Sequence, residues 1–201
     1  MLFTIGHSTH ALDEFISLLS QYKIDYVLDV RSIPYSKYAK QYNRETLDRY
    51  LQQHHIHYAY MGTYFGARQV NPALYAPDGY VDFEKVRSTP LFVTGMKNVE
   101  KGLLQKHEIA LMCTEKEPLN CHRAIMVARA FELEGYDIKH ILFDGSLLDQ
   151  KELNDRLLKK YFQNSVQMTL FDDEFHSANG LLKQAYIMRN KEIGYRLKCT
   201  K

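Results

Sequence analysis

Groups that can act as nucleophiles, acid–base catalysts or metal ligands are concentrated between residues 113 and 123, which read Cys113-Thr-Glu115-Lys-Glu117-Pro118-Leu-Asn-Cys121-His122-Arg123. The apolar run before them (109–112) predicts a buried strand, and the stretch after them (124–133) predicts a helix. Ligands of open α/β sheets bind outside the carboxyl ends of the strands. Residues 113–123, which we call the cysteine segment, are therefore the first candidate for a functional site.

Several chemistries suit this segment, and the sequence leaves them open. Cys121 precedes a predicted helix, where a thiol pKa falls, and so suits a nucleophile assisted by His122 or His7. The same two cysteines and two histidines supply enough zinc ligands, although their spacing is not that of a zinc finger. A redox disulfide is less consistent with a separation of eight residues, and Cys113 also fits a buried strand end. No metal ion or cofactor is assigned from the sequence.

Glu115 is an alternative acid–base group in the same segment. Pro118 restricts the backbone between the two cysteines, which favours any chemistry that needs a preorganised site.

Two other predicted strands end in polar residues. His7 and Ser8 follow the strand at 2–5, and Ser8 or its neighbour Thr9 is expected to cap the next helix. Asp29 and Arg31 lie at the end of the strand at 24–30. Because parallel strands bring their carboxyl ends together, we expect all four residues to share one pocket with the cysteine segment. A structural ion pair of Asp29 with Arg31 or Arg123 is the alternative.

Gly62 to Arg68 contains two glycines followed by an arginine. Glycine lets a backbone approach a ligand closely, and Arg68 can bind a phosphate or carboxylate. An ordinary turn with a solvated arginine is the alternative.

Apolar periodicity places these segments on alternating strands and helices. The expected strands are 2–5, 24–30, 57–61, 108–113 and 138–143, and the expected helices are 11–22, 44–54, 82–86, 91–105, 121–134 and 147–162, with a long loop at 62–81. This alternation predicts an α/β fold, with a mostly parallel, Rossmann-like sheet flanked by helices. We expect one domain at 1–162, followed at 163–201 by a polar linker and a last helix at 178–197.

Composition narrows the class of protein. The chain has 201 residues, of which 45% are apolar and 25% charged, as in a soluble globular protein. Neither an apolar run long enough to span a membrane nor a secretory signal is evident. Three cysteines argue against a disulfide scaffold, so a cytoplasmic location is expected.

Basic and aromatic residues are interleaved near the predicted second strand. Residues 31–70 hold six basic and two acidic side chains, and eleven of the fifteen tyrosines lie between Tyr22 and Tyr80. This pattern favours DNA or RNA binding by phosphate pairing and base stacking. A tyrosine-rich wall of the core or of a dimer interface is the alternative, and the oligomeric state is left open.

The predicted linker contains a short motif that resembles the peptide by which bacterial polymerases and repair proteins dock on the DNA sliding clamp. In it Met168, Leu170 and Phe171 would fill apolar clefts, while Gln167 would form hydrogen bonds at their edge. A tail that folds back onto the domain is the alternative.

The motifs taken together resemble the DUF488 family, in order over about residues 1–145. One difference is Ala67, where the family often has the second glycine of Leu-Gly-Gly-Arg. The resemblance implies an α/β domain with the motifs lining one cleft, and it implies no settled activity. The positions that match the family motifs are His7, Ser8, Asp29, Arg31, Arg68, Cys113, Glu115, Cys121, His122 and Arg123.

Three hypotheses follow. The first is a nucleotide- or nucleic-acid-processing enzyme, a hydrolase or transferase, that binds a phosphate-bearing substrate through Arg31, Arg68 and Arg123. Glu115 or His7 would be its acid–base group, with a cysteine assisting. The second is a non-catalytic module that binds an anionic metabolite or nucleic acid. The third is thiol or sulfur chemistry at Cys121.

Overall fold

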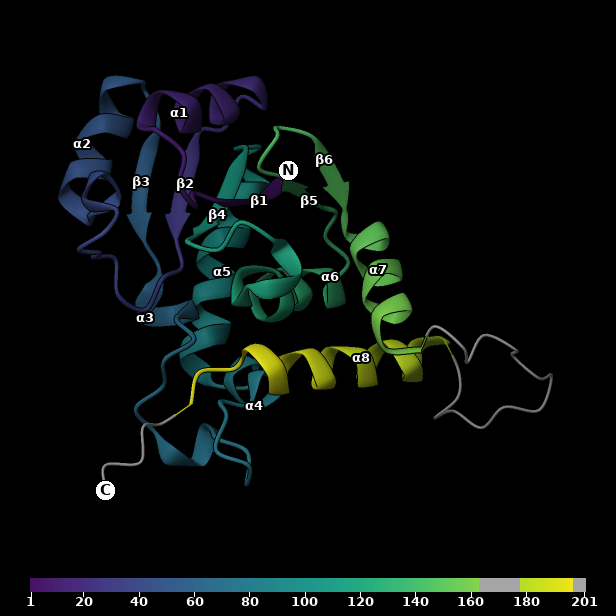
Figure 1. Cartoon of the computed structure of the whole chain (residues 1–201). Helices are drawn as coiled ribbons and strands as arrows, with labels where there is room; N and C mark the ends of the chain where they lie inside the picture. The colour runs from purple at the N-terminus through teal and green to yellow at the C-terminus, as the bar shows by residue number, and fades with distance from the viewer. Residues whose placement is uncertain (163–177, 197–201) are drawn as a thin grey trace.

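The fold is built on one sheet, seen in a computed structural model that describes residues 1–162 and 178–196 (Figure 1). Within these residues six strands are ordered β3-β2-β4-β1-β5-β6. Their bounds are β1 Leu2–Gly6, β2 Tyr26–Asp29, β3 His57–Tyr60, β4 Ile109–Cys113, β5 Ile138–Ile141 and β6 Leu147–Asp149. All pairs are parallel except β5 with β6. The predicted α/β fold with a mostly parallel sheet is confirmed.

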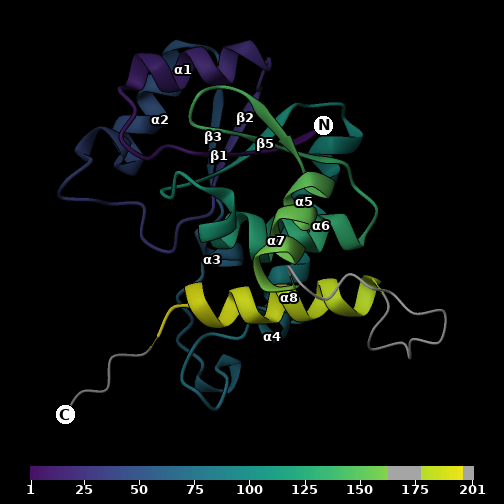
Figure 2. The ribbon, with the colours of Figure 1, turned by 45° about the vertical axis from the view of Figure 1, so that its right-hand side comes forward.

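Helices cover both faces of this sheet. They are α1 Leu12–Gln21, α2 Arg44–Gln53, α3 Gly62–Phe65, α4 Phe83–Arg87, α5 Pro90–Leu104, α6 Arg129–Leu133, α7 Gln150–Phe162 and α8 Ala178–Ile193. Short 3₁₀ turns lie at Lys40–Tyr42 (η1), Pro72–Leu74 (η2) and Pro118–Asn120 (η3), and a π-helical segment (η4) at Arg123–Ala128. Figures 1 and 2 show α1 and α2 together at one end of the molecule and α8 at the opposite end.

The alternation of side chains along each strand divides the core in two. Ala110 and Met112 of β4 pack with residues of α1 and α2. Leu111 and Cys113 point to the other face, where they pack with residues of α5, η4 and α6. Because successive strand side chains point to opposite faces, the last residue of β4 sends its thiol toward the helix that follows the cysteine segment.

The C-terminal helix α8 packs against the rest of the fold. Ala185, Tyr186 and Asn190 are buried. The Asn190 side chain accepts a hydrogen bond from the amide of Phe83 (2.8 Å) and donates one to the carbonyl of Val81 (2.9 Å). No helix in the described part of the chain combines the length and apolar character needed to span a bilayer.

The predicted helix at 147–162 is wrong at its start, because the first three of these residues form β6. A turn with Gly145 at a φ of 84° reverses the chain, and Lys139 then pairs with Asp149 across the hairpin. The free edge of β5 supplies hydrogen-bond partners for these residues, and α7 begins only at Gln150.

Other local predictions also need correction. The expected loop at 62–81 contains α3 and η2, and the expected helix at 121–134 begins as the π-helical η4. Neither Ser8 nor Thr9 caps α1: the N-cap is Ala11, whose amide donates to the Glu14 carboxylate (3.1 Å). Ser8 instead has a φ of 44° and donates its amide to the carbonyl of Thr114 (2.9 Å). This bond ties the end of β1 to the cysteine segment.

Candidate functional site

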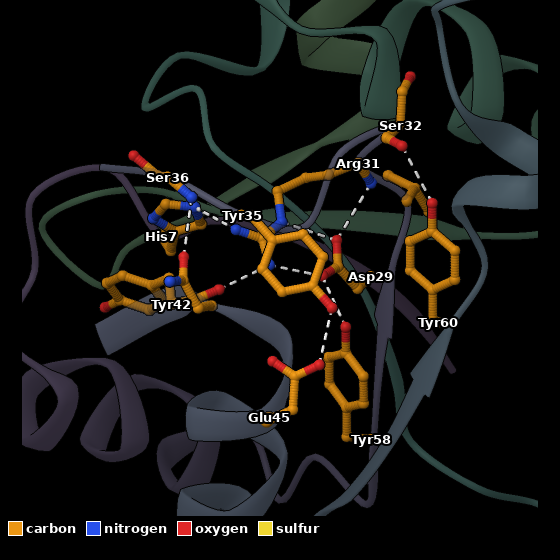
Figure 3. Close-up of polar contacts among 12 residues, drawn as sticks. His7, Asp29, Arg31, Ser32, Tyr35, Ser36, Tyr42, Glu45, Tyr58 and Tyr60 are labelled. Atoms are coloured by element: carbon orange, nitrogen blue, oxygen red, sulfur yellow. Dashed lines mark hydrogen bonds and ion pairs between the residues drawn. The ribbon is translucent and has the colours of Figure 1, made fainter. Parts of the chain in front are cut away.

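A buried ion pair lies at the end of β2, within a cluster of polar residues (Figure 3). The Arg31 guanidinium donates to both Asp29 carboxylate oxygens (2.8 and 2.5 Å). It also donates to the carbonyl of Tyr42 (2.8 Å), and the Tyr58 hydroxyl donates to Asp29 (2.8 Å). We call these four residues and His7 the Asp29 cluster. The ion pair expected as an alternative is present between Asp29 and Arg31.

His7 is held neutral within the Asp29 cluster. Burial and the Arg31 charge lower its pKa to about 4. Its ring stacks on Tyr42 (centroids 4.0 Å apart), Nδ1 lies 3.1 Å from the carbonyl of Ser8, and Nε2 lies 3.3 Å from Arg31. A carbonyl can only accept, so Nδ1 carries the proton and Nε2 accepts from Arg31. Both ring nitrogens of His7 therefore have partners within the protein.

The cysteine cluster, formed by Cys113, Cys121 and His122, lies on the opposite face of the sheet. Both thiols are buried and free. Nε2 of His122 lies 3.0 Å from the carbonyl of Val30, to which it donates, and Nδ1 lies 3.7 Å from the Cys113 sulfur. The three donor atoms Cys113 Sγ, Cys121 Sγ and His122 Nδ1 all lie within 4.8 Å of one another.

The two thiols of the cysteine cluster differ in their tendency to ionise. Burial raises the pKa of Cys121, but hydrogen bonds from Cys113 and His122 and the charge of Arg123 outweigh it and bring that pKa well below the usual value. The pKa of Cys113 is raised, because its thiol donates to Cys121 and because it is buried. Burial lowers the pKa of His122, but the Cys121 thiolate more than compensates and raises it. Cys121 is therefore the thiol that loses its proton first.

The buried Arg123 side chain stabilises the backbone of the cysteine segment. Its side chain is fully buried, and its guanidinium donates to the carbonyls of Glu115 (2.5 Å) and Lys116 (3.2 Å). Gly6 lets the end of β1 approach the same segment, because a Cβ there would lie 1.9 Å from the Glu115 carbonyl. Arg123 thus fixes the backbone of the segment.

The cysteine cluster opens into a pocket of about 250 Å³. Six of the ten motif residues line it: Arg31, Arg68, Cys113, Glu115, Cys121 and His122. The other four, His7, Ser8, Asp29 and Arg123, are not among the lining residues. For Asp29 the separation follows from strand alternation, since Asp29 shares a face with Val27 and its neighbours on the α1 side, whereas Cys113 points to the other face.

Comparison with known proteins identifies the family. A family model described as domain of unknown function DUF488 matches residues 11–130. The chain belongs to the DUF488 family. No match was found among curated proteins, and none among solved structures. The resemblance seen in the motifs is confirmed.

The DUF488 match includes the cysteine cluster but ends before the segment that closes one side of the pocket. Ile193, which ends α8, and Tyr195, which follows it, both line the pocket, and the Arg68 guanidinium lies 5.1 Å from the centre of the Tyr195 ring. The backbone carbonyl of Tyr195 accepts from the amide of Val81 (2.9 Å). Sequence reasoning missed both residues, since no motif near residue 195 indicates contact with residue 68.

Helix α8 also contacts the turn that leads to Cys121. Arg189 donates to the carbonyl of Leu119 (2.7 Å) and to the Asn120 side chain. These two positions belong to η3, so the C-terminal helix helps to fix the backbone before the second cysteine. The sequence shows only an arginine in a predicted helix and gives no signal for this role.

Glu115 is exposed near the mouth of the pocket and has an altered acidity. Partial burial of its carboxyl group raises its pKa, and the neighbouring Cys121 thiolate adds to the effect. Because it lines the same pocket as both thiols, its carboxyl group is available for proton transfer to a molecule bound there. The pocket thus combines an acidic thiol, a carboxyl group of raised pKa and three potential metal ligands.

Proposed function

We propose that this DUF488 protein is an enzyme that uses Cys121 as a nucleophile on a small anionic substrate bound in the pocket. The observation that supports this most directly is the placement of Cys121 beside Cys113 and His122 in the pocket wall. Hydrogen bonds from these neighbours stabilise the thiolate, which is the reactive form of a cysteine.

The reaction is a double displacement in which Glu115 transfers the proton. The Cys121 thiolate attacks an electrophilic carbon of the substrate and forms a carbon–sulfur bond, while the leaving group departs with the proton of Glu115. Water then attacks the same carbon and gives one proton back to Glu115. The carbon–sulfur bond breaks, and the Cys121 thiolate and the protonated Glu115 are regenerated.

Arg68 is the arginine best placed to recognise the anionic group. Among the arginines proposed for this role, Arg31 is engaged by Asp29 and Arg123 by backbone carbonyls. Arg68 lies at the pocket wall and over the Tyr195 ring. An arginine fork binds phosphate or carboxylate in two parallel hydrogen bonds. A phosphate-bearing substrate, such as a nucleotide or a nucleic-acid end, fits this arrangement.

The reactivity of the thiols tests the proposal without knowledge of the substrate. Metal-free, reduced protein is treated with iodoacetamide at pH 7, and modification of each cysteine is followed by mass spectrometry of peptides. We expect Cys121 to react at least tenfold faster than Cys113, because the two thiols are similarly buried but differ in acidity. Equal or slower reaction of Cys121 would overturn the nucleophile assignment.

A substrate screen then separates catalysis from binding. A panel of nucleotides, phosphorylated esters and short single-stranded DNAs is tested with wild type, Cys121→Ser and Glu115→Gln. We expect turnover to be lost in both variants while the pocket still binds the substrate. Binding without turnover by the wild type would favour the second hypothesis, a non-catalytic module. We expect the enzyme in the cytoplasm, where thiols stay reduced.

A further inference from the structure

We propose that the cysteine cluster is a binding site for a soft divalent cation, best matched by Zn²⁺, with Cys113 Sγ, Cys121 Sγ and His122 Nδ1 as its ligands. These atoms lie within 4.8 Å of one another. In a tetrahedral site with ordinary zinc bond lengths, a sulfur and a nitrogen ligand are about 3.6 Å apart. The observed distance from Cys113 Sγ to His122 Nδ1 is 3.7 Å.

The orientation of His122 independently supports a metal. Its Nε2–H donates to the carbonyl of Val30, which leaves Nδ1 directed toward the thiols, and the proton that Nδ1 shares with the Cys121 thiolate in the metal-free protein is released when a metal binds. Metal-binding histidines almost always have their other ring nitrogen fixed in this way by a carboxylate or a carbonyl.

The ligands are preorganised on backbone that is itself held in place. Cys113 ends the buried strand β4. Cys121 and His122 are adjacent in the cysteine segment, whose backbone carbonyls accept hydrogen bonds from Arg123. Binding would therefore require only small movements of the side chains. Two thiolates and an imidazole favour zinc over magnesium or calcium, which prefer oxygen ligands.

The fourth coordination position faces the pocket. All three ligand residues line it, and among the described residues no fourth histidine, cysteine or carboxylate joins the group. Three protein ligands with one open position are typical of zinc sites that bind water or a substrate group. A bound metal also takes up the electron pair of Cys121, so that the metal-loaded form has a masked nucleophile. This consequence rests on the proposed function, whereas the site itself rests on its geometry.

Cobalt titration of the full-length, reduced and chelator-treated protein tests the site. We expect one equivalent of Co²⁺ to produce a near-ultraviolet thiolate-to-cobalt band and the visible bands of tetrahedral cobalt, and Zn²⁺ to displace it. Cys113→Ser and His122→Ala should each weaken binding at least tenfold, while His55→Gln, at an exposed histidine outside the cluster, should leave it unchanged. No thiolate-to-cobalt band in the wild type, or an undiminished band in both cluster variants, would overturn the inference.

Protection from alkylation provides a second readout that needs no variant. One equivalent of Zn²⁺ should slow the iodoacetamide reaction of Cys121 at least tenfold. If the protein binds cobalt but Cys121 reacts no faster than Cys113, the metal site is supported and the proposal of a nucleophilic Cys121 is contradicted. If Cys121 reacts faster than Cys113 and Zn²⁺ does not slow its reaction, the nucleophile proposal is supported and the metal site is contradicted.

Discussion

At the scale of single residues, the Asp29–Arg31 pair is the contact whose loss the fold should tolerate least. The two side chains are 0% and 5% exposed and share two hydrogen bonds. Asp29→Asn leaves a buried guanidinium without its counter-charge, at a cost of about 3–5 kcal/mol in unfolding free energy. Urea denaturation followed by circular dichroism measures this loss.

A milder change serves as the matched control. Tyr58→Phe keeps the ion pair and removes one hydrogen bond to the carboxylate, for a loss of about 1.5–3 kcal/mol. If the Asp29→Asn protein proved as stable as the Tyr58→Phe protein, the pair would contribute little to stability.

His140 makes stability depend on pH. Burial lowers its pKa from 6.5 to about 3, and its two nitrogens pair with Thr4 and Gln150 (2.8 Å each). Below pH 6.5 the unfolded chain binds a proton that the folded protein excludes. His140 therefore makes the unfolding free energy fall as the pH drops from 6.5 toward 3, with a contribution of about 1.4 kcal/mol per pH unit at most. His7, with a pKa of about 4, adds to the same slope above pH 4. Urea denaturation at about pH 7, 6, 5 and 4 should show this slope.

His140→Gln should reduce that slope and leave the part that comes from His7, because glutamine keeps a donor and an acceptor but does not titrate in this range. An equivalent change at the exposed His55 is the control. An unchanged slope in the His140→Gln protein would exclude His140 as its source.

At the scale of elements, α8 holds the turn before Cys121 through Arg189. Arg189→Ala removes its hydrogen bonds to Leu119 and Asn120. The η3 amides that bond within the turn should then exchange with solvent at least tenfold faster, which hydrogen-exchange mass spectrometry detects. Arg156→Ala, which breaks an exposed ion pair on α7, should leave this exchange unchanged. Equal protection in both variants would show that α8 does not stabilise the turn.

Most elements could be predicted from the sequence because their signals are local. Five strands and the main helices follow from apolar periodicity, and the cysteine segment follows from its composition. The exception at 147–149 was not predictable in this way, because Leu147 and Leu148 suit either a helix start or a strand. The free edge of β5, a tertiary feature, decides between them.

The location of the site was predictable from local sequence signals, whereas the grouping of its residues was predictable only in part. The strand ends indicated where polar residues would gather, but strand alternation separates Asp29 from Cys113. The period of two along β2 places Asp29 on the same face as Val27, so this part of the arrangement follows from the sequence. By contrast, Arg68 and Tyr195 are far apart in the chain, and no local sequence pattern predicts their contact.

At the scale of the whole molecule, the tyrosine-rich segment serves the fold in several places. Tyr42 is fully buried, and the hydroxyls of Tyr58 and Tyr60 bond to Asp29 and to the carbonyl of Ser32. Tyr38 is fully exposed. Binding of DNA or RNA by this segment stays a prediction.

The sliding-clamp prediction concerns residues 167–171, which lie outside the described residues. If the motif docks as proposed, calorimetry with a bacterial clamp should show micromolar binding. The triple variant Gln167→Ala/Leu170→Ala/Phe171→Ala should lose it, because the apolar anchors and the edge amide are removed. Absence of binding by the wild type would remove the main reason to place this protein in DNA replication or repair.

The position of β1 has a consequence for how the protein is made. This strand lies between β4 and β5, so each of its hydrogen-bonded neighbours is more than 100 residues away in the chain. A ribosome adds about 5–20 residues per second. The first strand must therefore wait roughly 5–20 s for its earliest partner, whereas β2 and β3 are joined by one short crossover and can pair much sooner. During that interval an apolar segment of the nascent chain is unpaired and available to chaperones.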